Sequence, residues 1–245
     1  MLSPTLDDQT ALVTGSARGV GREVLLALAD CGADVAVQYR TSPEEAEVVA
    51  DVAREAGVEA LTVQADVTDP DSVDALFEAV EAELGTVDIL INNVGAFAPE
   101  RWDELDYATW QTVMETNLDA TYLCSKRALP GMRKAGDGRI VNVGYASSEK
   151  GLVSPKNFPY FVAKAGVLMF TRMLAADTSE DGITVNAVSP YVVENSAEFP
   201  EELPRGRPAH FEDLLQAVLF FLDPDSDYIS GANVEVSGGW LPERV

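Results

Sequence analysis

The chain has 245 residues, 47% of them hydrophobic, with 41 acidic residues against 17 basic ones and a net charge of −24. The length allows a full core and suits a single domain, and no basic leader or bilayer-spanning apolar segment is present, so a cytoplasmic protein is expected. Nucleic acid and anionic membranes would repel so acidic a surface, which excludes both as expected partners.

Short β-branched apolar runs alternate with amphipathic helical stretches along the chain. The predicted strands are Ala11 to Val13, Asp34 to Gln38, Ala60 to Val63, Asp88 to Ile91, Arg139 to Val143, Thr184 to Val188 and Asn233 to Val236. The predicted helices are Val20 to Cys31, Pro43 to Ala56, Asp71 to Leu84, Trp102 to Ala135, Phe158 to Asp177 and His210 to Leu222. The alternation predicts an α/β fold, with one doubly wound parallel seven-stranded sheet and helices on both faces. A single domain over residues 1–245 is expected, with a short loop covering a pocket at about 191–209.

The acidic excess also indicates an environment. In molar salt the screening length falls to about 3 Å, so like charges that repel one another in dilute buffer are tolerated. The composition therefore predicts a halophilic protein, with an ordinary acidic protein as the alternative.

Cysteine and histidine are too scarce for several kinds of chemistry. Cys31 and Cys124 lie in apolar helical patterns, so we expect core thiols rather than a disulfide framework or a metal site. His210 is the only histidine and lies at a predicted helix start, which favours a capping or surface role over catalysis.

A glycine-rich turn follows the first predicted strand and opens the first helix, as a phosphate-binding loop requires. It reads Thr14-Gly15-Ser16-Ala17-Arg18-Gly19-Val20-Gly21. Gly15 allows the tight turn, and Gly19 and Gly21 let the pyrophosphate and the helix approach closely. The spacing differs from the commonest dinucleotide fingerprint, and a plain strand-to-helix turn is the alternative.

The second predicted strand ends in Gln38-Tyr39-Arg40-Thr41-Ser42, where an acidic residue would hold the ribose hydroxyls of NAD. No acidic residue is there. Arg40, with Arg18 and the hydroxyls of Thr41 and Ser42, instead offers donors suited to a 2′-phosphate. The segment predicts that the cofactor is NADP(H). The alternative is that Arg40 is a solvated surface residue without a role in cofactor binding.

Tyr160 and Lys164 lie four residues apart, which places both on one face of a helix. A neighbouring ammonium stabilises a phenolate, so we expect Lys164 to lower the pKa of Tyr160 and to make it a proton donor near neutral pH. The same spacing occurs on ordinary exposed helices, so the pair is weak evidence alone.

Several motifs in order resemble the short-chain dehydrogenase/reductase family, from about residue 9 to the C-terminus. They are Thr14 to Gly21, Asp66-Val67, Asn92-Asn93-Val94-Gly95, Asn117, Tyr160 with Lys164, and Asn186-Ala187-Val188-Ser189-Pro190. Within the family the chain is most similar to 3-oxoacyl-carrier-protein reductases, and the segment from Gln38 to Ser42 also resembles pteridine reductases. The resemblance implies a Rossmann-like fold.

The resemblance implies a role for each matching residue. Tyr160 would protonate a carbonyl oxygen while NADPH delivers hydride, and Lys164 would also bond the nicotinamide ribose. Asn117 would kink its helix and hold a water in a proton relay to Lys164. Asp66 and Val67 would meet the adenine. The implied cofactor-binding residues are Gly15, Ser16, Arg18, Gly19, Val20, Gly21, Arg40, Thr41, Ser42, Asp66, Val67, Asn93, Val94, Gly95, Tyr160, Lys164, Pro190 and Val193, the last through its backbone.

Two departures from the family pattern affect the site. The family places a serine directly after the fifth strand to polarise the substrate carbonyl, and Tyr145 stands there. Ser147 lies thirteen residues before Tyr160, the family's common spacing, so we predict Ser147 in this role, with Tyr145 as the alternative donor and Ser148 a weaker one. Tyr191 follows Pro190 where the family has glycine, and the substrate loop after it is shorter than in relatives.

The sequence therefore predicts an NADPH-dependent reductase that converts a ketone, a 3-oxoacyl thioester or similar carbonyl, to the alcohol. The alternatives are an NADP-binding regulatory relative without turnover, a pteridine-reductase-like enzyme, and a dehydratase or epimerase. The resemblance implies a homodimer or homotetramer built on the two long helices within Trp110 to Leu129 and Phe161 to Leu174, with a further contact from Trp240 and Leu241.

Overall fold

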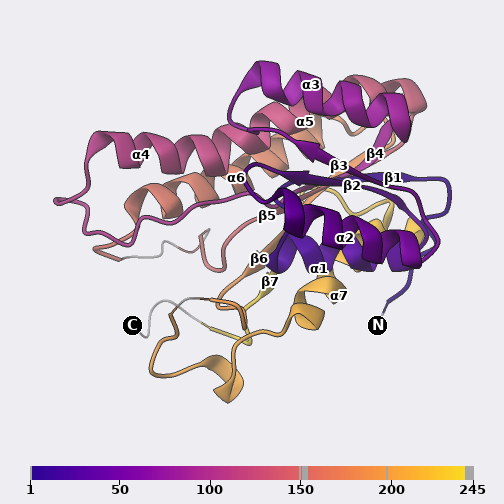
Figure 1. The fold of residues 1–245 in the computed structure, drawn as a ribbon. Helices are drawn as coiled ribbons and strands as arrows, with labels where there is room; N and C mark the ends of the chain where they lie inside the picture. Colours follow the sequence, from indigo (N-terminus) through magenta and orange to yellow (C-terminus); the bar gives the residue numbers. More distant parts are fainter. Residues whose placement is uncertain (1, 149, 151–153, 197, 241–245) are drawn as a thin grey trace.

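The computed structural model describes residues 2–148, 150, 154–196 and 198–240. Seven parallel strands form one sheet in the order β3-β2-β1-β4-β5-β6-β7 (Figure 1). The strands are β1 (Thr10–Val13), β2 (Asp34–Tyr39), β3 (Ala60–Gln64), β4 (Val87–Asn92), β5 (Gly138–Val143), β6 (Ile183–Pro190) and β7 (Asn233–Val236). The predicted α/β fold with a doubly wound, Rossmann-like sheet is confirmed.

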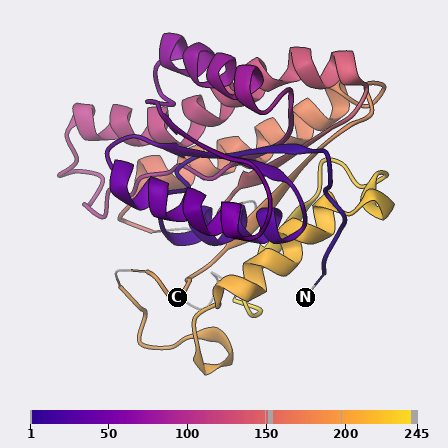
Figure 2. The same cartoon turned by 45° about the vertical axis from the view of Figure 1, so that its right-hand side comes forward.

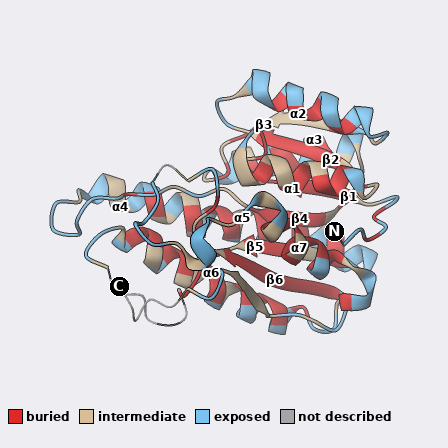
Figure 3. Ribbon diagram, turned by 90° about the horizontal axis from the view of Figure 1, so that it is seen from below, coloured by how far each residue is buried: buried red, intermediate tan, exposed pale blue. Residues whose placement is uncertain are grey.

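Helices cover both faces of the sheet (Figures 1 and 2). The helices are α1 (Gly19–Asp30), α2 (Pro43–Glu55), α3 (Pro70–Glu83), α4 (Tyr107–Met114), α5 (Ala120–Ala135), α6 (Phe158–Asp177) and α7 (Phe211–Leu222). One buried apolar cluster joins the sheet to α1, α2 and α7, and a second joins it to α3, α5 and α6. The central strands β1, β4 and β6 are buried almost throughout (Figure 3), as parallel strands packed on both faces must be.

Short-range chemistry sets many of the helix ends. Pro43 and Pro70 begin α2 and α3, where a missing N–H costs nothing, and the Asp69 carboxylate accepts a bond from the Asp71 N–H. Gly136 ends α5 in the left-handed conformation, with φ of 73°. These signals explain why most predicted boundaries lie within two residues of the observed ones.

The predicted helix from Trp102 to Ala135 is wrong at its start and in its middle. Trp102 donates its N–H to the Pro155 carbonyl and its ring stacks on Phe158, which ties this segment to the chain before α6. The bonds from the Glu104 and Leu105 N–H groups to the Arg101 carbonyl close a turn that does not continue into a helix. The helix begins at Tyr107, after Asp106 has capped it by accepting from the Thr109 N–H at 2.7 Å. Residues Glu115–Asp119 then form a turn of π-helix between α4 and α5.

The two thiols differ in burial. Cys124 is buried, and burial raises its pKa to about 12, so it is a core thiol as predicted. Cys31 is only half-buried, at the end of α1, because it faces the N-terminal segment rather than the sheet. No described helix combines the length and apolar character needed to cross a bilayer.

Candidate active site

Hydrogen bonds fasten the glycine turn, which follows β1, to β2 and to the segment after β4. The Gly15 N–H donates to Gln38 Oε1 at 2.7 Å, and the Thr14 hydroxyl oxygen accepts from the N–H groups of Asn93 and Val94. A Cβ on Gly21 would lie 2.5 Å from the Gly15 carbonyl oxygen, so only glycine lets α1 approach the turn this closely. The turn is therefore a rigid cradle at the carboxyl ends of β1, β2 and β4.

The N-terminus of α1 lies open beside this turn. No side chain caps it and no acidic residue lies in its first turn, whereas Asp69 and Asp106 cap α3 and α4. Its free N–H groups and positive dipole end attract an anion. The Ser16 hydroxyl close by is buried and bonds to no other described residue.

A cavity of about 640 Å³ runs from this cradle across the sheet edge. Twelve of the predicted cofactor residues line it: Gly15, Arg18, Gly19, Val20, Arg40, Thr41, Ser42, Asp66, Val67, Asn93, Val94 and Gly95. The glycine cradle, the open helix end and the unpaired Ser16 hydroxyl fit a bound dinucleotide. Arg40 lies at the far end, where its Nη1 is 3.7 Å from Asp66 Oδ2 and its side chain is 64% exposed.

Tyr160 and Lys164 are both almost fully buried, on the first two turns of α6. Lys164 Nζ donates to the Val143 carbonyl oxygen at 2.6 Å and lies 5.7 Å from the centroid of the Tyr160 ring. Burial, with Tyr145 as a smaller cause, raises the pKa of Tyr160, and burial lowers the pKa of Lys164 to about 8. The net lowering expected from the spacing is therefore not found: burial raises the pKa of Tyr160 in this arrangement.

Asn117 lies at the centre of the π-helical turn and is wholly buried. Its Nδ2 donates to the carbonyl oxygens of Ala96 and Val113, whereas its Oδ1 bonds to no other described residue. Asn117 Oδ1 and Lys164 Nζ lie 2.6 and 3.5 Å from the place that a Cβ on Gly95 would occupy. The two polar atoms thus face the same small space, which is the arrangement a water relay needs.

The two candidates for a second hydroxyl lie in different surroundings. The Tyr145 ring is edge-on to Tyr160, with centroids 5.6 Å apart, and burial raises the Tyr145 pKa. Ser147 is fully buried with φ of 64°; its N–H donates to Glu235 Oε1 at 2.9 Å, and its hydroxyl lacks a partner among the described residues. The structure places the Tyr145 ring against Tyr160 and buries the Ser147 hydroxyl.

Pro190 and Val193 lead from β6 into the substrate loop. The Pro190 carbonyl oxygen accepts from the Ala146 N–H, which ties this strand end to the loop after β5. The Val193 N–H donates to Ser196 Oγ at 3.2 Å, and the Val193 carbonyl oxygen accepts from the Ser196 N–H at 2.8 Å. The backbone of Val193 would bind a carboxamide only after Ser196 released it.

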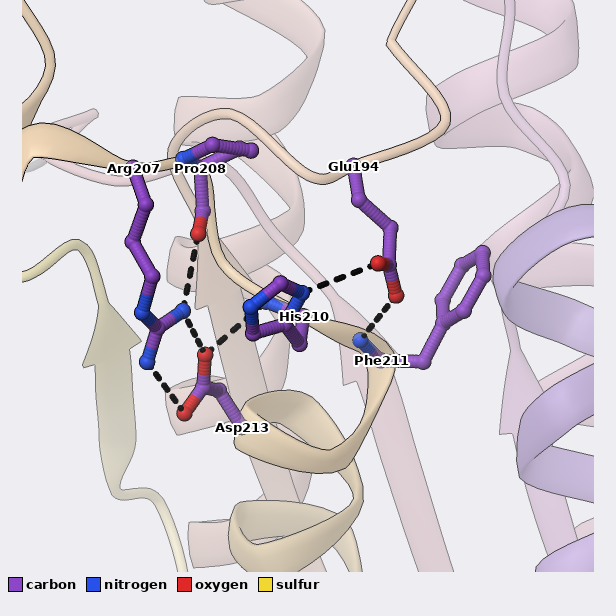
Figure 4. Close-up of polar contacts among 6 residues, drawn as sticks. All are labelled: Glu194, Arg207, Pro208, His210, Phe211 and Asp213. Carbon is purple, nitrogen blue, oxygen red and sulfur yellow. Dashed lines mark hydrogen bonds and ion pairs between the residues drawn. The ribbon is translucent and has the colours of Figure 1, made fainter.

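A polar cluster anchors the end of the substrate loop to α7 (Figure 4). The Glu194 carboxylate contacts His210 Nδ1 at 2.9 Å and accepts from the Phe211 N–H at 2.8 Å. Asp213 accepts from the His210 N–H and from Arg207. His210 therefore caps α7 from an exposed position, as predicted, and Ala197 of this loop lies outside the described residues.

Gln38 and Asn195 are two polar residues of the cavity lining that sequence reasoning missed. Gln38 bonds Gly15 through Oε1 and donates from Nε2 to the Ala65 carbonyl oxygen, so it positions the cradle. Asn195 reaches over the turn, where its Nδ2 lies 2.9 Å from the place of a Cβ on Gly19. A polar residue at the end of a buried strand signals the first, whereas the second depends on how the loop folds back.

The nucleotide cradle on a doubly wound sheet and the buried tyrosine, lysine and asparagine beside it define a dinucleotide-dependent oxidoreductase. Residues 15–241 match the family model described as Enoyl-(Acyl carrier protein) reductase. The chain is 35% identical to a 3-oxoacyl-(acyl-carrier-protein) reductase FabG of Staphylococcus aureus, over 94% of this chain and 97% of that one. It belongs to the short-chain dehydrogenase/reductase family, whose members use NAD(P) and act on CH–OH groups or the corresponding carbonyls.

Two further relatives show the range of the family. The chain is 39% identical to a cis-4-hydroxycyclohexanecarboxylate dehydrogenase of Sinomonas cyclohexanicum, over 95% of this chain and 96% of that one. A solved gluconate 5-dehydrogenase of Burkholderia cenocepacia, in complex with NADP and tartrate, superposes with a TM-score of 0.88 at 30% identity and covers 96% of this chain and 95% of its own.

Proposed function

We propose that this protein is an NADPH-dependent reductase that converts a ketone to the alcohol, with Tyr160 as the proton donor. The observation that carries the proposal is that Asn117 Oδ1 and Lys164 Nζ face one small space at Gly95, which lines the nucleotide cavity, while the buried Tyr160 ring lies 5.7 Å from the same Nζ. All the elements pack on one sheet, which supports a single domain that both binds the dinucleotide and performs the reaction. The substrate proposal is a 3-oxoacyl thioester or a similar small ketone.

The residues divide the chemistry between them. NADPH, when bound, supplies hydride to the carbonyl carbon, and Tyr160 gives its proton to the carbonyl oxygen. Lys164, with a pKa of about 8, can exchange protons near neutral pH and can return one to Tyr160. Asn117 Oδ1 can hold the water through which that proton arrives.

The test is the loss of NADPH absorbance in molar salt with acetoacetyl thioesters, small diketones and pterins. Turnover of a ketone supports the proposal, whereas turnover of pterins alone would assign a pteridine reductase. Tight NADPH binding without turnover of any of these compounds would support the regulatory alternative. The feature of the chain that favours this alternative is the unusual loop after β5, in which the Ser147 N–H donates to Glu235.

Arg40 is expected to set the preference for NADPH. Replacing it with alanine (Arg40→Ala) removes a charge-assisted bond to the 2′-phosphate and should lower the ratio of kcat/KM for NADPH over NADH about tenfold. The matched control is Arg101→Ala, an exposed arginine paired with Asp103, which should leave the ratio unchanged. A wild-type protein that prefers NADH would remove the inference.

For the hydroxyl that polarises the carbonyl, we propose Ser147, because its buried hydroxyl has no partner among the described residues, with Tyr145 as the alternative. Ser148, whose hydroxyl also has none there, stays the weaker candidate. Ser147→Ala should lower kcat about a hundredfold with NADPH affinity kept, because a donor to the developing oxyanion is lost. Tyr145→Phe should change kcat by less than about threefold if Ser147 has this role. A large loss of kcat in Tyr145→Phe with little change in Ser147→Ala would assign the role to Tyr145. Ser154→Ala, a change elsewhere in the same loop, is the control and should leave kcat unchanged.

We also propose a homodimer or homotetramer. Tyr122 on α5 and Val162, Met169 and Met173 on α6 are 45–63% exposed, which is a large apolar surface for two neighbouring helices. Trp240 stacks instead on Tyr191 of its own chain, and Leu241 lies outside the described residues.

The remaining proposals are a cytoplasmic location and halophily, of which the net charge of −24 supports the second. Assembly and salt dependence can be tested together. In molar salt, light scattering should give the mass of two or four chains and circular dichroism a full helical signal. Desalting to millimolar ionic strength should reduce both signals, because unscreened carboxylates repel one another. An unchanged spectrum after desalting would contradict halophily, and the mass of one chain in salt would contradict assembly.

A further inference from the structure

Six aromatic side chains, among them the reactive tyrosine, are joined by ring contacts and form what we name the aromatic cluster: Phe97, Tyr145, Tyr160, Phe161, Tyr191 and Trp240. They come from the segments that follow β4, β5, β6 and β7 and from the start of α6. The rings are linked from Phe97 to Trp240 by centroid distances between 3.9 and 6.4 Å. Phe97, Tyr145 and Phe161 contact the Tyr160 ring directly. Tyr145 in turn contacts Tyr191 and Trp240, so it connects the stacked pair to the reactive tyrosine.

The cluster has two sides. Phe97 lies over the Tyr160 ring with centroids 4.2 Å apart, and its side chain is 63% exposed. On the other side, Tyr191 and Trp240 stack 3.9 Å apart at 10°, and the Tyr145 ring stands edge-on to both of them. The Tyr191 N–H donates to the Val236 carbonyl oxygen, so this stacked pair is held to the end of β7.

These rings keep part of their surface open to solvent. Tyr145, Tyr191 and Trp240 are each only partly buried, although Tyr160 beside them is 5% exposed. A flat ring gains both burial and edge-to-face or stacked contacts on such a surface, whereas a flexible acyl chain gains burial alone and loses chain entropy. A ring one or two carbons from the carbonyl would reach the cluster while the carbonyl oxygen lies at Tyr160.

We infer that this site is selective for ketones that carry an aromatic ring close to the carbonyl, which the Tyr191–Trp240 pair and Tyr145 hold. The inference rests on the proposed reduction and narrows its substrate class. The stacked pair positions the substrate, and the chemistry stays with Tyr160 and Lys164.

The experiment compares two ketones with ten carbons and unconjugated carbonyls, benzylacetone and 2-decanone, with diacetyl as a small reference. The wild-type kcat/KM should be at least about tenfold higher for benzylacetone than for 2-decanone, the factor that ring contacts of this kind supply. Trp240→Ala and Tyr191→Ala should each reduce that ratio several-fold, and Trp240→Phe should keep most of it. Tyr228→Ala, which changes a fully exposed tyrosine, is the matched control.

A binding measurement gives a readout that is independent of turnover. Benzylacetone should quench the fluorescence of the NADPH-loaded Tyr160→Phe protein, and the quenching should weaken in the double variant that also carries Trp240→Phe. Equal kcat/KM for the two ketones, with Tyr160-dependent reduction of diacetyl intact, would overturn the inference and leave the proposed function standing. No NADPH oxidation with any ketone would overturn both.

Discussion

Tyr160→Phe should lower ketone reduction about a thousandfold while NADPH affinity stays within about threefold of wild type. The substitution removes one hydroxyl from a ring that is 5% exposed and packed between Phe97 and Tyr145, so the packing is retained. Burial raises the pKa of this phenol, which keeps the proton on it at neutral pH. Initial rates in molar salt and NADPH titration by fluorescence measure the two quantities.

The control for this substitution is Tyr107→Phe, on the exposed start of α4. It should leave both quantities unchanged. A Tyr160→Phe protein with wild-type turnover and normal circular dichroism would assign the proton to another donor.

Lys164→Met should abolish most of the turnover and yet make the folded protein more stable at pH 7. Burial lowers the pKa of Lys164 from 10.5 to about 8, a shift worth about 3 kcal/mol against folding while both states are charged. Losing the charge-assisted bond from Nζ to the Val143 carbonyl oxygen offsets about 2 kcal/mol of this gain. We expect a net increase of about 1 kcal/mol in the free energy of unfolding.

The pH dependence of this difference follows from the direction of the shift. Below about pH 8 lysine is charged in both states, so wild type bears the full cost of a buried ammonium. Between pH 8 and the ordinary lysine value the unfolded chain binds more protons than the folded one, so wild-type stability rises with pH and the advantage of Lys164→Met shrinks. Denaturant unfolding of both proteins at pH 7 and pH 10 measures this change in the stability difference. The control is Lys126→Met, which replaces an exposed lysine on α5. An advantage that grows with pH would contradict a buried, charged lysine.

The fold could be predicted from local patterns because its strands are apolar on both faces and its helices carry strong start and stop signals. Pro43, Pro70 and Gly136 mark helix ends that depend on neighbouring residues only. The predicted helix start at Trp102 was wrong because the Trp102 N–H bonds to the carbonyl oxygen of Pro155, more than fifty residues away in the chain. Contacts of that range leave no periodic signal.

The site divides in the same way. The cradle residues could be predicted because the glycine spacing has a backbone reason that the Cβ distances at Gly21 confirm. The pKa of Tyr160 could not be predicted from the sequence. The four-residue spacing places Lys164 on the same helix face but does not reveal that both groups are buried away from water. The bonds between Val193 and Ser196 and the stacking of Trp240 on Tyr191 likewise depend on how two loops fold.

The most direct test of the account is a crystal structure with NADP and an alcohol product bound, in which the Tyr160 hydroxyl oxygen is located relative to the nicotinamide and the product. The account predicts the hydroxyl within hydrogen-bonding distance of the product oxygen, with Lys164 Nζ reaching the nicotinamide ribose from the same side of the cleft. A nicotinamide bound away from α6, or a Tyr160 hydroxyl that faces away from the product, would contradict it.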